Sequence, residues 1–95
     1  MDPRVISAIM SKIDEAISNA EEVYKIQSSL GSLAGEGSGF AYGVAVGRIY
    51  NSFHYQTRRI LGRNATDAEF SEFLSLLSSR APEIRRAFSD DEKQP

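Results

Sequence analysis

Apolar residues recur at three- and four-residue steps over the first third of the chain, with serines and acidic residues on the opposite side. The positions of this face are Ile6, Ile9, Met10, Ile13, Ala16, Ile17, Ala20, Val23, Tyr24, Gln27 and Leu30. The pattern predicts an amphipathic helix over residues 3–30, which begins where Asp2 caps the free amides and Pro3 takes the first helical position. Its heptad spacing favours an antiparallel hairpin or a coiled-coil contact.

Residues 39–61 also separate into two sides on a helical wheel. One side carries Tyr42, Gly43, Val46, Gly47, Ile49, Tyr50, Phe53, His54, Thr57, Ile60 and Leu61. The other carries Arg48, Asn51, Ser52, Tyr55, Gln56, Arg58 and Arg59. This separation predicts a second, half-buried helix with Ser38 as its cap and Gly62 as a left-handed residue at its end.

Three glycines, Gly39, Gly43 and Gly47, recur every fourth residue in this second helix. Each glycine inside a helix costs about 0.5–1 kcal/mol relative to alanine, so we expect a compensating contact. Another helix backbone can approach closely along such a stripe, either the helix of residues 3–30 or a second copy. Three interpretations stay open: the glycines make room for large side chains of the same chain, form a symmetric dimer contact, or leave space for a ligand.

Local signals mark the ends of the helices that flank the middle of the chain. Four glycines within residues 31–39 predict a flexible connection over residues 31–38, in which Gly31 can serve as the left-handed cap of the first helix. Thr66 and Glu69 have the spacing of a capping box, which predicts that a third helix occupies residues 67–80.

The third helix carries an apolar face that continues in phase beyond it. Its members are Phe70, Phe73, Leu74, Leu77, Ala81, Ile84 and Phe88. Pro82 interrupts the helix, so we expect a break or kink near Arg80 and a short helix over residues 82–88 that keeps the same face inward. The polar tail of residues 90–95 has no apolar anchor and is expected to be disordered.

These elements predict one all-α domain over residues 1–89. Two long antiparallel helices form a helical hairpin, and the third helix and the short C-terminal helix complete a bundle-like core. The apolar band of residues 3–30 is longer than the partners that one chain supplies. A homodimer through the first two helices is therefore expected.

Charge is distributed unevenly along a chain whose formal net charge is -2 and whose pI is about 5.3. The second helix and its end carry a basic and aromatic stripe of Arg48, Tyr55, Arg58, Arg59 and Arg63. Such a stripe can grip phosphates and stack on bases, pair with acidic protein surface, or stay in solvent. The acidic neighbouring segments favour charge complementarity within the chain, and the low pI is atypical of dedicated nucleic-acid domains.

Catalytic chemistry has little support in this sequence. The chain has no cysteine, which excludes disulfides and thiolate chemistry. His54, the only histidine, has no metal-ligand partner at helical spacing, and we expect a partly buried, hydrogen-bonded side chain. The glycines of residues 35–39 match neither phosphate-binding fingerprint. The aromatic residues Tyr42, Tyr50, Phe53, Phe70 and Phe73 are expected to be core, and the alternative is that they line a small apolar pocket where the glycines leave space. We expect no enzymatic activity, cofactor or metal.

The expected function is therefore that of a small protein–protein interaction or structural module that acts through helix–helix contacts. The alternative is a nucleic-acid-binding protein that uses the basic and aromatic stripe. The N-terminus lacks the pattern of a signal peptide, and no apolar run has the length of a membrane span. A cytoplasmic protein without membrane contact is expected.

Overall fold

The computed structural model describes residues 1–35, 37 and 39–88, and within them every regular element is a helix. The elements are α1 (Pro3–Ser18), α2 (Ala20–Ser29), α3 (Gly31–Ala34), α4 (Gly39–Leu61), α5 (Asp67–Ser79) and α6 (Ala81–Ala87). The all-α fold class is thus confirmed. The expected cap at Ser38 and the expected tail of residues 90–95 lie outside the described residues.

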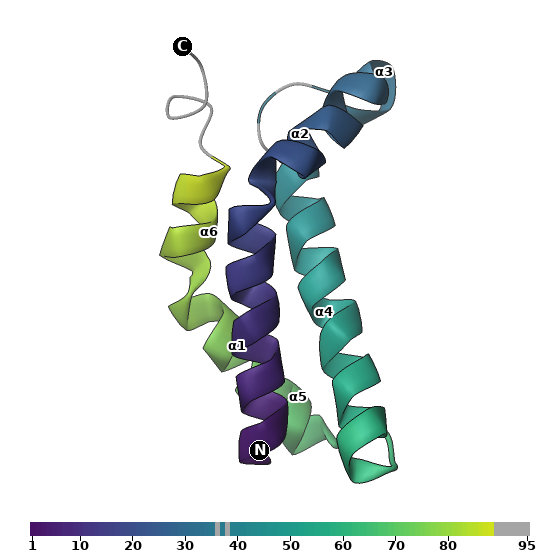
Figure 1. The fold of residues 1–95 in the computed structure, drawn as a ribbon, viewed down its shortest axis with the longest axis vertical. Helices are drawn as coiled ribbons and strands as arrows, with labels where there is room; N and C mark the ends of the chain where they lie inside the picture. The colour runs from purple at the N-terminus through teal and green to yellow at the C-terminus, as the bar shows by residue number, and fades with distance from the viewer. Residues whose placement is uncertain (36, 38, 89–95) are drawn as a thin grey trace.

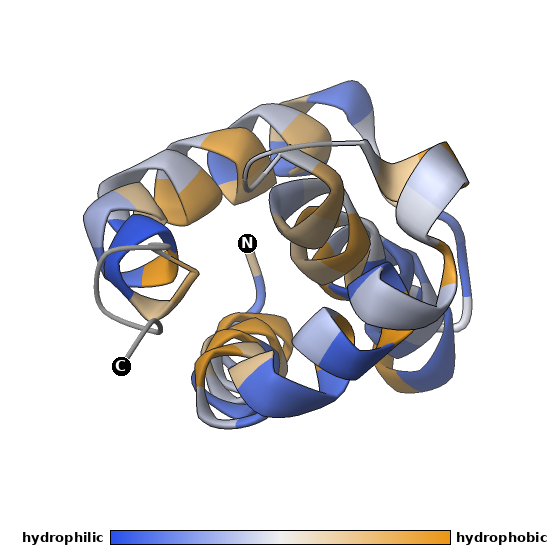
Figure 2. Cartoon of the chain, turned by 90° about the horizontal axis from the view of Figure 1, so that it is seen from above, coloured by the Kyte–Doolittle hydropathy of each residue, from blue (hydrophilic) through white to orange (hydrophobic). Residues whose placement is uncertain are grey.

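Helices α1 and α4 lie side by side and run in opposite directions, while α5 crosses behind α1 in this view and α6 packs against α1 (Figure 1). Seen along the bundle, the apolar positions of the helices lie mostly on their inward sides (Figure 2). The core formed in this way is dominated by aliphatic and phenylalanine side chains. Its buried members are Val5, Ile9, Ile13, Ala16, Ala20, Val23, Ala41, Ala45, Ile49, Phe53, Phe73, Ile84 and Phe88.

The face that α4 turns inward carries two alanines in its first half and larger residues further along. Ala41, Ala45, Ile49, Phe53 and Thr57 are all buried and recur every fourth residue. In an antiparallel arrangement, the alanines of α4 meet the end of α1 and the start of α2, where small residues are buried as well. Small side chains on both helices let the two backbones approach closely at this end of the bundle.

The structure corrects the expectation that the chain's own helices pack along the glycines. Gly39, Gly43 and Gly47 are exposed, and a Cβ atom added at any of them would meet no atom within 4 Å. Neither the helix of residues 3–30 nor a large side chain of the same chain fills this space. The physical reason is that Ala41 and Ala45, two residues after each of the first two glycines, already permit the close approach and add apolar surface to the core. Contact of the glycines with a second copy stays a prediction.

The expected continuous helix over residues 3–30 is also wrong, because the chain leaves helical geometry at two places. At Asn19 the backbone has φ -102° and ψ 25°, and α2 then bends over the start of α4 (Figure 1). Asparagine is a weak helix former because its side chain competes for backbone hydrogen bonds. A second interruption at Leu30 precedes the single turn α3, so the left-handed glycine after this region is Gly35, with φ 72°, and not Gly31.

Local signals at the other helix ends are confirmed. Gly62 has φ 69°, and its amide donates to the carbonyl of Arg58 at 2.9 Å. The capping box is complete, since the Glu69 amide donates to Thr66 Oγ1 at 3.1 Å and the Thr66 amide donates to Glu69 Oε1 at 2.9 Å. The helix is interrupted at Arg80, between α5 and α6. The side of α6 that carries Ile84 continues the buried face of α5, as expected.

A ring stack and an ion-pair cluster contribute to holding the C-terminal helices against the rest of the bundle. The rings of Phe53 and Phe73 stack with centroids 4.5 Å apart and planes 6° apart, which joins α4 to α5. Arg80 joins α1 to α6, because its Nη2 lies 2.8 Å from Asp14 Oδ1 and 2.7 Å from Glu83 Oε2. The Arg80 side chain is only 14% exposed, whereas Asp14 and Glu83 are 67% and 42% exposed, so solvent screens both pairs.

Two adjacent residues of α5 test this description of the core. Phe73 is 1% exposed and Leu74 is 47% exposed. Replacement Phe73→Ala should lower the free energy of unfolding by about 3–5 kcal/mol, because it removes a stacked ring and leaves a cavity. Leu74→Ala should cost less than about 1 kcal/mol. Urea unfolding followed by circular dichroism measures both, and equal losses would contradict the placement of α5.

Candidate functional site

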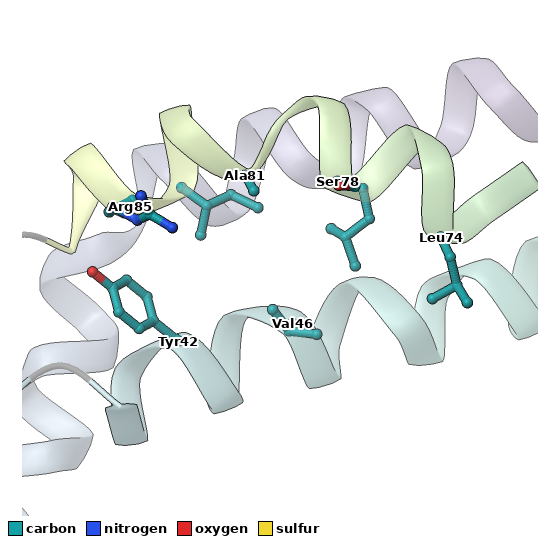
Figure 3. A pocket seen from close by; sticks show the side chains of 8 residues that line it. Tyr42, Val46, Leu74, Ser78, Ala81 and Arg85 are labelled. Carbon is teal, nitrogen blue, oxygen red and sulfur yellow. The ribbon is translucent and has the colours of Figure 1, made fainter.

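An apolar groove lies between α4 and the α5–α6 pair. It has a volume of about 330 Å³ and is lined by Tyr42, Val46, Leu74, Leu77, Ser78, Ala81, Ile84 and Arg85. Figure 3 shows Val46 and Leu74 on opposite walls, with Tyr42 and Arg85 at one end. The groove exists because α5 and α6 are held mainly through α1 and the Phe53–Phe73 stack, so the exposed side of α4 is only partly covered.

The groove opens onto apolar side chains that stay exposed. We call Val46, Tyr50, Phe70 and Leu74 the α4–α5 apolar surface, since all four are large hydrophobic residues exposed by more than a third. The rings of Tyr50 and Phe70 meet edge to face with centroids 6.3 Å apart, so the surface is continuous across the two helices. Contiguous apolar patches of this kind mark interaction sites more often than scattered exposed residues do.

The predicted glycine stripe borders this surface. Gly43, Val46, Gly47 and Tyr50 follow the i, i+3, i+4, i+7 spacing of one helix face, and both glycines are exposed. The open space above the glycines therefore lies next to the exposed side chains of Val46 and Tyr50. Together they form a shallow, uncharged face of α4 that is open at the two glycines and partly exposed at Val46 and Tyr50.

The basic and aromatic stripe does not form one surface. Arg48 Nη2 lies 3.7 Å from Glu15 Oε1 on α1. Arg63 lies before α5 and binds to its first turn, since its Nη1 and Nη2 donate to the Glu69 carboxylate at 2.8 and 3.1 Å. Arg59 donates from Nε to Gln56 at 2.8 Å.

Two members of the stripe have no ion pair or hydrogen bond of their side chains to another described residue. Tyr55 and Arg58 are both exposed on α4. Within the stripe, Arg48 and Arg63 therefore pair with acidic residues of the same chain, whereas Arg58 is exposed to solvent.

His54 and the aromatic residues occupy different environments. The half-buried ring of His54 lies against Tyr50 and Phe53, with centroid distances of 4.8 and 4.9 Å. No hydrogen bond of its side chain joins it to another described residue, in contrast to the expectation. The described residues also contain no group of three or more histidine and acidic side chains that could hold a metal ion. Of the five aromatic residues expected in the core, Phe53 and Phe73 are buried, while Tyr50 and Phe70 are exposed.

Of the five aromatic residues that the sequence offered for a pocket, only Tyr42 lines the groove. The other walls were not predicted, because Leu74, Leu77 and Ile84 have the same periodicity whether they line a groove or fill a core. The available signal was the width of the apolar face of α4. That face includes both Ala45 and Val46, which is more than one neighbouring helix can cover.

Comparison of the chain with protein-family models, with curated proteins and with solved structures finds no match. Among the described helices, none is both long and apolar enough to cross a membrane. A function therefore has to be inferred from the surfaces of this chain.

The ion pair at the start of α5 predicts a dependence of stability on pH. Hydrogen bonds from the Arg63 side chain and from the Thr66 amide lower the pKa of Glu69 from its ordinary value of 4.5 to about 2. Because the folded protein favours the ionised carboxylate, its contribution is complete above pH 4.5 and is lost as the pH falls towards about 2.

Replacement Glu69→Gln should flatten the decrease of unfolding free energy over this pH range, since glutamine keeps the capping geometry without the charge. Glu21→Gln, which changes an exposed carboxylate without an ion pair to a described residue, is the matched control and should leave the slope almost unchanged. Thermal unfolding between pH 2 and pH 6 measures both, and identical slopes for the two variants would refute the role of Glu69.

Proposed function

We propose that the protein is a small interaction module that self-associates through helix–helix contacts. In this proposal α1 and α4 form an antiparallel helical hairpin, and two copies meet where their α4 helices cross at Gly43 and Gly47. Val46 and Tyr50 then pack around the crossing point.

The observation that carries the proposal is the open space at the two glycines. An alanine at Gly43 or Gly47 would meet no atom of the chain within 4 Å and would stabilise the helix by about 0.5–1 kcal/mol. The glycines therefore weaken α4 without improving the packing of a single chain. A helix from outside that approaches this face would use the absence of both side chains.

The chemistry of the face favours a second copy as the partner. From Gly39 to Gly47 the stripe contains no charged residue, and neither do Val46 and Tyr50 beside it. A two-fold contact places the same patch against itself, so an uncharged patch brings no like charges together. If the two α4 helices cross in opposite directions, the glycines of one copy lie opposite those of the other, and each Tyr50 projects beyond the crossing point.

The end of the bundle near the start of α4 supplies a further apolar surface. Ile26, Leu30 and Leu33 follow one another at i, i+4 and i+7, and all three are exposed, Leu33 by 76%. Ile26 belongs to α2 and Leu33 to α3, and α3 extends beyond the start of α4 (Figure 1). Their exposure supports association, because contiguous apolar surface in contact with water favours burial against a partner.

Bulky substitutions at the glycines test this proposal. Gly43→Leu and Gly47→Leu should retain the helical circular dichroism spectrum, because the space around both residues is open within one chain. In a dimer each would place two leucines at the crossing point, and overpacking should raise the dimer Kd by at least about tenfold. Sedimentation equilibrium measures the change.

The matched control is Ser11→Leu, which adds a leucine to the exposed side of α1 opposite its buried face. This variant should dimerise as the unmodified chain does. A chain that stays monomeric up to about 1 mM, or glycine variants that dimerise as tightly as the control, would refute the proposal.

A further inference from the structure

A polar hollow lies between α1 and α4, and it adjoins the glycine stripe at Asn51, four residues after Gly47. Its volume is about 410 Å³, within the range of about 300–1,000 Å³ that is usual for small-molecule sites. Its lining residues are Lys12 from α1 and Arg48, Asn51, Ser52, Tyr55 and Gln56 from α4.

All six lining side chains carry at least one N–H or O–H donor, and none is a carboxylate. Two of them, Lys12 and Arg48, are cations that approach the hollow from different helices. A concave surface of donors with two positive charges is complementary to an oxyanion with several acceptor oxygens, such as a phosphate.

Most of these donors are not used within the described part of the chain. Arg48 makes an ion pair with Glu15 at 3.7 Å, which is beyond hydrogen-bonding distance, and donates no hydrogen bond to a described residue. Lys12 donates to the same carboxylate at 3.1 Å. Gln56 accepts a hydrogen bond from Arg59 through Oε1, so its amide N–H groups stay available. The same bond places Arg59, a third cation, beside a residue that lines the hollow.

Tyr55 adds an aromatic surface to this donor set. Its side chain is 57% exposed and lines the hollow beside Arg48. An exposed aromatic ring next to a cationic hollow allows a base to stack on the ring while its phosphate lies among the cations. No other lining residue is aromatic, so one stacked base is what the hollow can accept.

We infer that this hollow binds a nucleotide unit, with the phosphate held by Lys12 and Arg48 and the base stacked on Tyr55. The unit belongs either to single-stranded nucleic acid or to a free mononucleotide, which present the same phosphate and base. Glu15 lies between the two cations and is displaced from them when the phosphate binds. The inference uses none of the residues of the proposed dimer contact and does not depend on it.

Fluorescence anisotropy with a fluorescein-labelled oligodeoxythymidylate of about eight nucleotides at low salt tests the inference. Arg48→Ala and Tyr55→Ala should each weaken binding by at least about fivefold. Arg48→Ala should also lower the slope of log affinity against log salt concentration by about the amount that one phosphate contact contributes. Glu15→Gln should strengthen binding by about two- to fivefold, because the competing carboxylate is removed.

Arg58→Ala is the matched control, because it removes the same charge from an exposed position of α4 outside the hollow. It should change binding by less than about twofold. Equal losses for Arg48→Ala and Arg58→Ala, or unchanged binding by Glu15→Gln, would overturn the inference, because either result indicates diffuse attraction to the basic helix. Absence of both oligonucleotide and mononucleotide binding at low salt would overturn it as well.

Competition distinguishes the two sources of the ligand. Displacement of the oligonucleotide by thymidine monophosphate at similar affinity would assign the site to a free nucleotide, and weak displacement would assign it to a strand that adds contacts. Displacement by inorganic phosphate alone at that same affinity would refute the role of Tyr55. The Gly47→Leu variant should bind the oligonucleotide with the same affinity as the unmodified chain. This result would separate the test of the hollow from the test of the dimer.

Discussion

The packing of α1 and α2 against the alanine side of α4 determines how every other surface of the molecule is oriented. Ala41 and Ala45 are fully buried, so α4 cannot rotate about its axis without exchanging them for larger or charged residues. This rotation places Gly43 and Gly47 in solvent on one side and Arg48 beside α1 on the other. Both candidate surfaces are thus consequences of one close helix contact.

The helix ends around Gly62, Thr66 and Arg80 were predictable because each depends on a few neighbouring residues, whereas the left-handed cap expected at Gly31 was wrong. The capping box of Thr66 and Glu69, the left-handed Gly62 and the break before Pro82 all lie where their local chemistry places them. The break at Asn19 was not predictable from periodicity, since Ala16 and Ala20 on its two sides are both buried. A hydrophobic pattern can continue across a change of direction when both segments face the same core.

The orientation of α4 about its own axis was predicted wrongly, and this larger error explains why the position of the groove was not predicted. The helix carries two small-residue stripes, Ala41 with Ala45 and Gly43 with Gly47, and either permits a close approach. The choice between them depends on the partner, because alanine adds buried apolar area that glycine lacks. Sequence alone defined a broad apolar arc on α4, whereas the part covered by α5 and α6 follows from the stacking of Phe53 on Phe73.

The two candidate surfaces are centred on different sides of α4, with Lys12 and Arg48 of the hollow towards α1 and the glycines towards solvent. A second copy seated on the glycine side would leave the hollow lined by Lys12 and Arg48 open in both copies. A dimer would then present two nucleotide sites on one rigid body, and a strand long enough to reach both would bind more tightly than its single-site affinity allows. Dimer formation would therefore strengthen the binding of a long strand without any new contact, while a mononucleotide would gain nothing from it.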